Sequence, residues 1–298
     1  MSSSRSKQYK LDQSPFYGLK SKKKLAKFLQ VSLTKLKSLT QSENLYIEQD
    51  RFDPKRKKIR HVEKPKPILK QVQKRIEELL KRIEIPDYIH SPAKGRSYIS
   101  NAKAHVNSPD VRSFDIKQYF ASTPSRRVYW FFHKRMKCSS DVAGILTNLL
   151  TFKDHLPTGS PSSPILSYFA HIDMWEEISK IVESGGCILT VYMDDVTISG
   201  RQVPGILIWQ VIQQFYRCGL RDNKKKQKHY ADKKPREITG VIIRDNQLKL
   251  PNRQHLKMHQ CRQFIQQEVN WEKRDKPKQI LKGLESQEQQ VKKANLDI

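Results

Sequence analysis

The sequence lacks any apolar run that approaches the roughly 18 residues needed to cross a membrane. Its first residues, Met-Ser-Ser-Ser-Arg-Ser-Lys, also lack the apolar core of a secretory signal. The first absence argues against a membrane-spanning protein and the second against a secreted one. We therefore expect a cytoplasmic protein with no membrane partner.

Cysteine is scarce as well. The four cysteines, Cys138, Cys187, Cys218 and Cys261, are widely separated and show no Cys-x-x-Cys spacing. This pattern argues against a zinc site and against the disulfide frame of a small secreted domain. We expect reduced thiols in the core.

Acidic residues are few compared with basic ones: 30 Asp and Glu face 57 Lys and Arg, a net charge of +27. Such an excess points to a polyanionic partner, with nucleic acid first and a membrane surface as the competing polyanion. The 298 residues suffice for one large domain or two to three subdomains, and an apolar fraction of 37% suffices for a core.

Helix-like and strand-like patterns alternate along the chain, which is typical of an α+β fold. Apolar residues at helical spacing predict helices at 22–29, 33–39, 68–83, from 125, 140–150, 165–182, 206–218 and along the basic tail 251–298. Runs of β-prone residues between turn residues predict strands at 45–50, 57–62, 111–116, 188–192, 196–199, 238–244 and 248–250.

One predicted hairpin carries two adjacent acids at its tip, Asp194 and Asp195, between the arms 188–192 and 196–199. A polar turn that only keeps the hairpin soluble is one interpretation. The arms are almost wholly apolar, however, so the hairpin is expected to be buried, and burying two unpaired carboxylates is costly. A cation would remove that cost, so the pair is a candidate metal site that needs a third acid.

Asp115 is the candidate third acid, because it ends the apolar strand at 111–116. If that strand neighbours the acidic hairpin, three carboxylates meet at one edge of the sheet. Such a site suits Mg²⁺, and two ions about 3.5–4 Å apart would support phosphoryl transfer on a nucleic acid. A nuclease and a polymerase both satisfy this chemistry, and a helix N-cap is the alternative role for Asp115.

Four segments resemble, in order, the motifs of reverse transcriptases. They are Phe-Asp-Ile-Lys-Gln-Tyr-Phe at 114–120, Leu-Pro-Thr-Gly-Ser-Pro-Ser-Ser-Pro at 156–164, Tyr-Met-Asp-Asp at 192–195 and Gly-Leu-Arg-Asp-Asn-Lys-Lys-Lys at 219–226. The resemblance covers roughly residues 45 to 250. A Tyr-x-Asp-Asp box alone is weakly specific, whereas four motifs in the family's order are strongly specific.

Two further boxes are similar to those of the bacterial retron reverse transcriptases. Asn-Ala-Lys-Ala-His at 101–105 matches their Asn-Ala-x-x-His box, and Ile-Thr-Gly at 238–240 resembles their Val-Thr-Gly box with Ile in place of Val. Through this resemblance Asn101, His105, Thr239 and Gly240 are expected to bind the cognate RNA. A local turn and a histidine satisfied by nearby hydrogen bonds are the alternative roles for Asn101 and His105.

The resemblance also implies roles at the catalytic centre. Asp115, Asp194 and Asp195 would hold two Mg²⁺ ions, and Lys226, or its neighbour Lys225, would protonate the leaving pyrophosphate. The nucleotide-binding residues would be Lys58 and Arg60 on the basic strand, the carbonyl of Ile116, the steric gate Phe120 and the loop residue Gly159. The alternative for Lys58 and Arg60 is a basic strand face that is simply solvated. The alternative for Phe120 is an ordinary core phenylalanine. Thr158 departs from the family's usual Gln, and the consequence of Met193 is left open.

The resemblance implies a right-hand polymerase with fingers, palm and a small helical thumb. We expect an N-terminal helical extension at 1–50, fingers and palm at 51–245, and a basic thumb that binds RNA at 246–298. The implied activity is RNA-directed DNA synthesis from dNTPs, in which a structured non-coding RNA supplies template and a 2′-OH primer and yields branched msDNA. An antiphage role with a separate effector protein, in a possible higher-order complex, is also implied.

The alternatives are a defence or diversity-generating reverse transcriptase outside the retrons, and a catalytically idle RNA-binding scaffold. The Asn-Ala-x-x-His and Thr-Gly boxes argue against the former, and the three intact acids argue against the latter.

Overall fold

The structure is a computed structural model that describes residues 8–54, 57–231, 234–268 and 270–296. The chain forms two compact units, each assembled from several segments. The first unit consists of Met1–Asp87, Ile116–Ile178 and Ile212–Asp222, and the second of Tyr88–Asp115, Ser179–Val211 and Asn223–Ile298. Mixed helix and sheet confirms the α+β prediction.

The first unit is mainly helical. Its helices are α1 (Lys22–Phe28), α2 (Leu33–Gln41), α3 (Pro67–Leu80), α5 (Ser125–Trp130), α6 (Ser140–Leu150) and α7 (Ser163–Ala170), while α8 (Ile172–Ser184) and α9 (Gly205–Arg217) each run from one unit into the other. Hydroxyl caps fix several helix starts: Ser21, Ser32 and Ser139 accept hydrogen bonds from the backbone N–H three residues on. The predicted α3 stripe is core, with Leu69, Val72 and Ile76 all buried.

One predicted helix is wrong in its extent. The apolar pattern over 165–182 is interrupted at His171, where α7 ends and α8 begins. His171 is fully buried, and its Nε2 lies 3.2 Å from the hydroxyl of Thr123. Apolar residues are buried on both sides of His171, so the apolar spacing continues from one helix into the next. The spacing alone therefore does not show where α7 ends.

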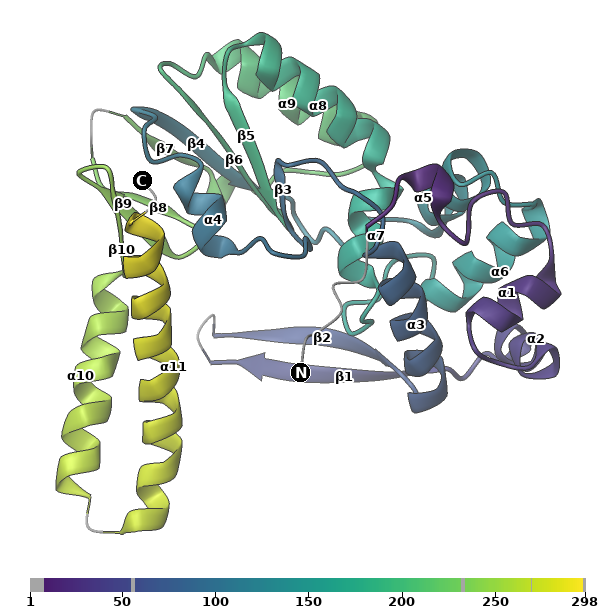
Figure 1. The fold of residues 1–298 in the computed structure, drawn as a ribbon, viewed down its shortest axis with the longest axis horizontal. Helices are drawn as coiled ribbons and strands as arrows, with labels where there is room; N and C mark the ends of the chain where they lie inside the picture. The colour runs from purple at the N-terminus through teal and green to yellow at the C-terminus, as the bar shows by residue number, and fades with distance from the viewer. Residues whose placement is uncertain (1–7, 55–56, 232–233, 269, 297–298) are drawn as a thin grey trace. The chain divides into compact units, whose positions relative to one another are not determined.

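The first unit also contains the hairpin of β1 (Tyr46–Asp53) and β2 (Lys58–Pro65), which lies beside α3 in Figure 1. The register places Arg51 opposite Arg60 and Gln49 opposite Val62 on one face. Because side chains alternate along a strand, Glu48, Asp50 and His61 fall on the other face. The predicted hairpin is therefore confirmed, with each strand a few residues longer than expected.

The second unit is built on a five-stranded sheet in the order β3-β5-β6-β4-β7. The strands are β3 (Ile89–Ser91), β4 (Asp110–Asp115), β5 (Ile188–Tyr192), β6 (Asp195–Gly200) and β7 (Lys228–Tyr230), with β3 parallel to β5 and the other pairs antiparallel. The short helix α4 (Tyr98–Lys103) begins at a capping box made by Ser97 and Ser100. It contacts β3 and β5.

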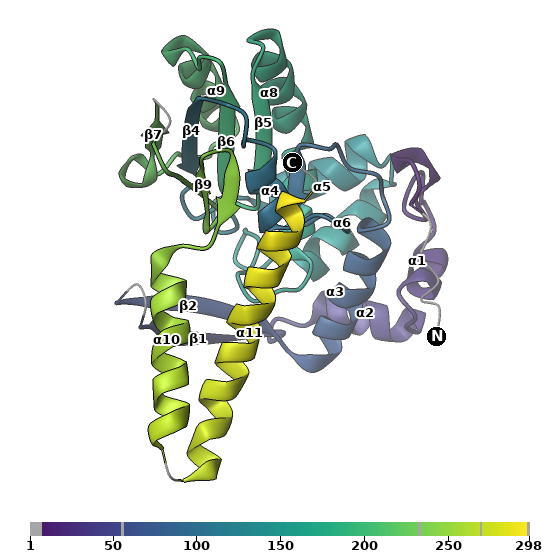
Figure 2. The same cartoon turned by 60° about the vertical axis from the view of Figure 1, so that its left-hand side comes forward.

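A smaller sheet and two long helices complete the second unit. The sheet has the order β10-β9-β8, formed by β8 (Arg236–Ile238), β9 (Val241–Arg244) and β10 (Gln247–Lys249). The run predicted as one strand at 238–244 is two strands, because Thr239 and Gly240 both take positive φ and make a tight turn. The helices α10 (Asn252–Gln267) and α11 (Trp271–Asn295) lie side by side in Figures 1 and 2.

A single apolar cluster joins these elements of the second unit. Ile99 and Ala102 of α4 pack with Ile243 of β9 and with Met258 and Val291 of the two long helices. The C-terminal helices are therefore part of a shared core. None of the helices in the described part of the chain combines the length and the apolar character that a membrane crossing requires.

Candidate active site

The acidic hairpin forms as predicted, from β5 and β6. Its arms are mostly buried, while Asp194 is half-buried and Asp195 is exposed. The turn is tight because Tyr192 pairs directly with Asp195, and Met193 takes a left-handed conformation with a φ of 61°. The N–H of Met193 donates to the carbonyl of Ser91 at 3.2 Å, which ties the turn to β3.

Asp115 lies beside this hairpin. It ends β4, and the antiparallel register of β4 and β6 places it directly opposite Asp195. The alternative role as a helix N-cap is excluded, since the next helix, α5, begins at Ser125 with Pro124 as its N-cap. The third acid is thus at the sheet edge that the sequence predicted.

The electrostatics of the three acids favour a cation. Burial, together with the charges of Asp195 and Asp115, raises the pKa of Asp194 to about 6. Asp115 is buried, and its carboxylate accepts from Lys226 Nζ at 2.5 Å and from the side-chain amide of Asn223 at 3.3 Å. The lysine ammonium thus supplies positive charge beside Asp115, one of the two acids whose charge raises the pKa of Asp194.

The same geometry separates the two lysines left open by the sequence. Lys226 lies at the end of the short 3₁₀ helix Lys224–Lys226 and reaches Asp115. Lys225 lies in the same helix, and both lysines are exposed, so the contact with Asp115 is what distinguishes Lys226. Lys226 is the lysine that this structure brings to the acids. Asn223, which the sequence analysis did not single out, lies just before this helix, and its backbone N–H also donates to the Asp115 carbonyl at 2.8 Å.

The donor set fits a divalent cation of the hard, oxygen-binding class. In this structure Asp115 is engaged by Lys226, and the three aspartates are not gathered as closely as three ligands of one ion. Among the described residues, the trio whose candidate ligand atoms all lie within 4.8 Å of one another is Glu48, His61 and Glu63 on the β1–β2 hairpin. Those carboxylates are already paired, Glu48 with Lys153 and Glu63 with His155.

The expected nucleotide-binding residues lie in the first unit. Arg60 pairs with Asp53 across the hairpin at 2.9 Å, and the backbone of Lys58 lies opposite Asp53, while the Lys58 side chain lies outside the described residues. Ile116 is fully buried and bridges to Asp222. Phe120 is half-buried, so it is not an ordinary core phenylalanine.

Gly159 has a packing role in the first unit. Its N–H donates to the Glu63 carbonyl of β2 at 3.0 Å, and a Cβ at this position would lie 2.4 Å from that carbonyl oxygen. Thr158, where the family usually has Gln, uses its hydroxyl to accept from the Glu63 N–H at 3.3 Å and to donate to the His61 carbonyl at 3.3 Å. The loop is thus fastened to the hairpin.

The four expected RNA-binding residues divide into two kinds. Asn101 and His105 are buried, with 1% and 0% of their surface exposed, so direct RNA contact by these two side chains does not fit this structure. Thr239 and Gly240 form the half-buried β8–β9 turn. The two boxes meet: the Asn101 amide donates to the Thr239 hydroxyl at 3.3 Å, and that hydroxyl donates to the Tyr98 carbonyl at 3.0 Å.

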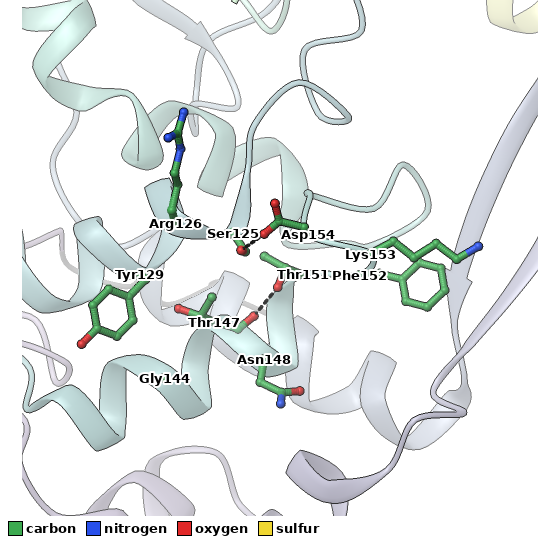
Figure 3. Close-up of a pocket in the computed structure, with 10 residues that line it drawn as sticks. All are labelled: Ser125, Arg126, Tyr129, Gly144, Thr147, Asn148, Thr151, Phe152, Lys153 and Asp154. Atoms are coloured by element: carbon green, nitrogen blue, oxygen red, sulfur yellow. Dashed lines mark hydrogen bonds between the residues drawn. The ribbon is translucent and has the colours of Figure 1, made fainter. Parts of the chain in front are cut away.

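A cavity of about 470 Å³ lies in the first unit between α5 and α6. Figure 3 shows hydroxyl groups on its wall: Ser125 hydrogen-bonds to Asp154, and Thr151 to the backbone of Thr147. None of the three aspartates lines it, so it is separate from the acidic site.

Comparison with known proteins finds a matching family model and similar chains. Residues 48–243 match the family model described as reverse transcriptase (RNA-dependent DNA polymerase). The chain is similar to the retron Se72 reverse transcriptase of Salmonella heidelberg, with 28% identity over 68% of this chain and 56% of that protein. It is also similar to the retron Ec86 reverse transcriptase of Escherichia coli, with 25% identity over 63% of this chain and 59% of that protein.

The chain thus spans less than two thirds of the length of either relative. Among solved structures, the fold is similar to that of telomerase from Candida albicans in complex with a fragment of telomeric RNA, with a TM-score of 0.52 at 10% identity. That match covers 78% of this chain and 52% of the other. At this identity the likeness concerns the fold alone.

Proposed function

Because this chain belongs to the reverse transcriptase family, we propose that it copies RNA into DNA as the polymerase of a retron. One observation carries the catalytic part of the proposal. Asp115 of β4 lies directly opposite Asp195 of β6, the neighbour of Asp194 in the chain, and Lys226 reaches Asp115.

Enzymes of this family use divalent metal ions, and here Asp115, Asp194 and Asp195 would hold two Mg²⁺. Bound there, the ions would activate the primer hydroxyl and neutralise charge on the phosphates. Lys226 would then leave Asp115 and donate its proton to the departing pyrophosphate. Its contact with Asp115 in this structure supports that role, because it keeps the ammonium beside the reacting groups.

Nucleotide selection is assigned to the first unit. Phe120 would exclude a 2′-OH beneath the sugar, and the half-buried state of its ring leaves a surface for that contact. Lys58 and Arg60 would bind the triphosphate, with Arg offering a two-pronged donor. Ile116 would contribute its carbonyl, and Gly159 would keep the loop close to the nucleotide.

In this proposal the five-stranded sheet is the palm, the β1–β2 hairpin belongs to the fingers, and α10 with α11 is the thumb. The corresponding sequence ranges are 1–50 for the extension, 51–245 for fingers and palm, and 246–298 for the basic thumb. Basic residues on both long helices support an RNA-binding thumb, among them Lys257, Arg262, Lys278 and Lys282.

The retron assignment rests on the similarity to two proteins named as retron reverse transcriptases. It implies a structured non-coding RNA as template and primer, branched msDNA made from a 2′-OH, and an antiphage role in the cytoplasm with an effector protein. The turn at Thr239 and Gly240 would contact that RNA, with Asn101 and His105 supporting the surface from inside.

Primer extension tests the proposal: a primed RNA template, dNTPs and Mg²⁺ are incubated with the wild type and with Asp194→Ala. We expect extension by the wild type and at least a 100-fold loss in the variant, since removal of an electrostatic stabiliser of the transition state typically costs about 10²–10³. Equal extension by both proteins, or none by the wild type, would refute the polymerase activity and favour an RNA-binding scaffold.

Nucleic acid that copurifies with the protein from its host tests the retron assignment. We expect DNA joined to RNA by a 2′,5′ link, and unbranched RNA alone would contradict the assignment.

A further inference from the structure

A buried chain of polar side chains lies beneath the acidic hairpin. His105, which follows α4, places Nε2 at 2.7 Å from the hydroxyl of Thr190 and Nδ1 at 2.6 Å from the hydroxyl of Ser199. Thr190 belongs to β5 and Ser199 to β6. One imidazole therefore bonds to both arms of the hairpin that carries Asp194 and Asp195.

The direction of these bonds follows from the donors available. The Ser199 hydroxyl donates to Ser108 at 2.9 Å, so it accepts from His105 Nδ1–H. In the neutral ring Nε2 carries no proton and accepts from the Thr190 hydroxyl. All four side chains are buried, with at most 6% exposed, and burial lowers the pKa of His105 to about 3. The ring is neutral at the pH of DNA synthesis, as this bonding pattern requires.

The register shows which acids this chain supports. Thr190, Tyr192 and Asp195 share one face of the sheet, because Tyr192 pairs with Asp195 and Thr190 pairs with Thr197. Asp115 lies on the same face, opposite Asp195. The imidazole bonds are thus made on the side of the sheet that bears two of the three acids.

The segment that holds His105 is itself fixed to the smaller sheet. The buried guanidinium of Arg236, at the start of β8, donates to the carbonyls of Val106 and Ser108. Asn101, one turn earlier in α4, is tied to Thr239, which directly follows the same strand. His105 therefore has support on both sides and cannot turn away without breaking several buried hydrogen bonds.

We propose that His105 is a positioning residue for DNA synthesis: it sets the spacing of β5 and β6 and so holds Asp194 and Asp195 where they bind metal. This rests on the proposed polymerase function, and it assigns to the Asn-Ala-x-x-His box a task inside the protein. Misplacement of reacting groups by about 1 Å costs on the order of 10² in rate. Loss of the imidazole lowers kcat while leaving the dNTP site, in the first unit, intact.

The test compares His105→Ala and His105→Gln with the wild type. We expect His105→Ala to lower kcat on a primed RNA template by about 10–100-fold, with KM for dNTP within about twofold. Mn²⁺ binding, followed by electron paramagnetic resonance without nucleic acid, weakens several-fold, and amide exchange of β5 and β6 becomes faster. His105→Gln keeps a hydrogen-bond donor and an acceptor, so we expect it to recover part of the lost kcat and part of the lost Mn²⁺ affinity.

His171→Ala is the matched control. His171 is also fully buried, its pKa is likewise lowered to about 3, and it lies in the first unit. It should lower the melting temperature without changing Mn²⁺ binding or exchange of β5 and β6. If His105→Ala is insoluble, Thr190→Val and Ser199→Ala each remove one hydrogen bond of the imidazole, and Ser199→Ala also removes the bond to Ser108; both carry the same expectation.

Two results would overturn the proposal. One is a folded His105→Ala protein with wild-type Mn²⁺ binding and kcat. The other is a variant whose only defect is a raised KM for the RNA, which would indicate RNA recognition. Neither result affects extension by the wild type, so failure here is distinguishable from failure of the polymerase assignment.

Discussion

At position 194 a carboxyl group stands beside two others, and this crowding makes the site sensitive to pH. The pKa of Asp194 rises from 3.8 to about 6 because burial and the neighbouring acids oppose its charge. Between these values the folded chain binds more protons than the unfolded one. The metal-free protein therefore loses stability as pH rises from 4 to 6, relative to a variant without this group.

A metal ion competes with that proton, so we predict that apparent Mn²⁺ affinity falls about tenfold for each pH unit below 6. Calorimetric titration between pH 5 and 7.5 measures this, and thermal unfolding without metal measures the stability. Asp194→Asn should remove the stability change between pH 4 and 6. Affinity that stays constant over this range would contradict the assignment of Asp194 as a ligand.

Gly159 allows the loop after Phe152 to lie on β2, and its replacement tests that contact. Since a Cβ would lie 2.4 Å from the Glu63 carbonyl oxygen, we predict that Gly159→Ala destabilises the protein by about 1–3 kcal/mol. Gly144→Ala is the control, because in α6 a Cβ meets no atom within 4 Å and alanine favours a helix. We expect Gly144→Ala to stabilise the protein by about 0.5–1 kcal/mol, and thermal unfolding measures both variants. An unchanged stability of the Gly159→Ala protein would show that the loop can move away from β2.

Among the elements, α10 shows how far the C-terminal helices depend on the sheet. Met258 is 3% exposed and belongs to the shared apolar cluster, whereas Leu256 on the same helix is 58% exposed. We predict a loss of about 2–5 kcal/mol for Met258→Ala and less than about 0.5 kcal/mol for Leu256→Ala. Chemical denaturation compares the two, and equal small losses would mean that α10 is not packed on the core.

Sequence patterns predicted the longer elements well, because each depends on local features. The acidic hairpin follows from β-branched arms and a polar tip, and α2 from its Ser32 cap and leucine spacing. The strands β3, β7 and β8 were missed, or joined to a neighbour. Each has three residues. β3 and β7 pair with distant segments, which no local pattern encodes, whereas β8 pairs with β9 across a two-residue turn and was read as one strand with it.

The candidate site was predicted in part for the same reason. Acidic residues at strand ends pointed to Asp115 and the doublet, because strand ends meet at a sheet edge. The contact of Lys226 with Asp115 spans 111 positions and cannot be derived from spacing. The burial of His105 could not be predicted either, because the sequence of the Asn-Ala-x-x-His box is the same whether its histidine contacts RNA or packs inside the protein.

At the scale of the whole molecule, the charge of +27 predicts how the chain holds RNA. If it neutralises about 6–10 phosphates, affinity for a structured RNA falls by roughly 10³–10⁵ between 50 and 200 mM salt. Fluorescence anisotropy with labelled RNA measures the slope. Asp194→Ala should bind with the same slope, and salt-independent binding would argue against phosphate contacts as the main source of affinity.

The interleaving of the two units has a consequence for how the protein is made. The first unit needs residues up to Asp222, and the second begins at Tyr88 and uses the C-terminal helices. Neither is a continuous stretch that a ribosome delivers complete before the other has started. Both must finish folding late in synthesis, and a premature stop within the C-terminal helices would leave the sheet that bears the acids without part of its core.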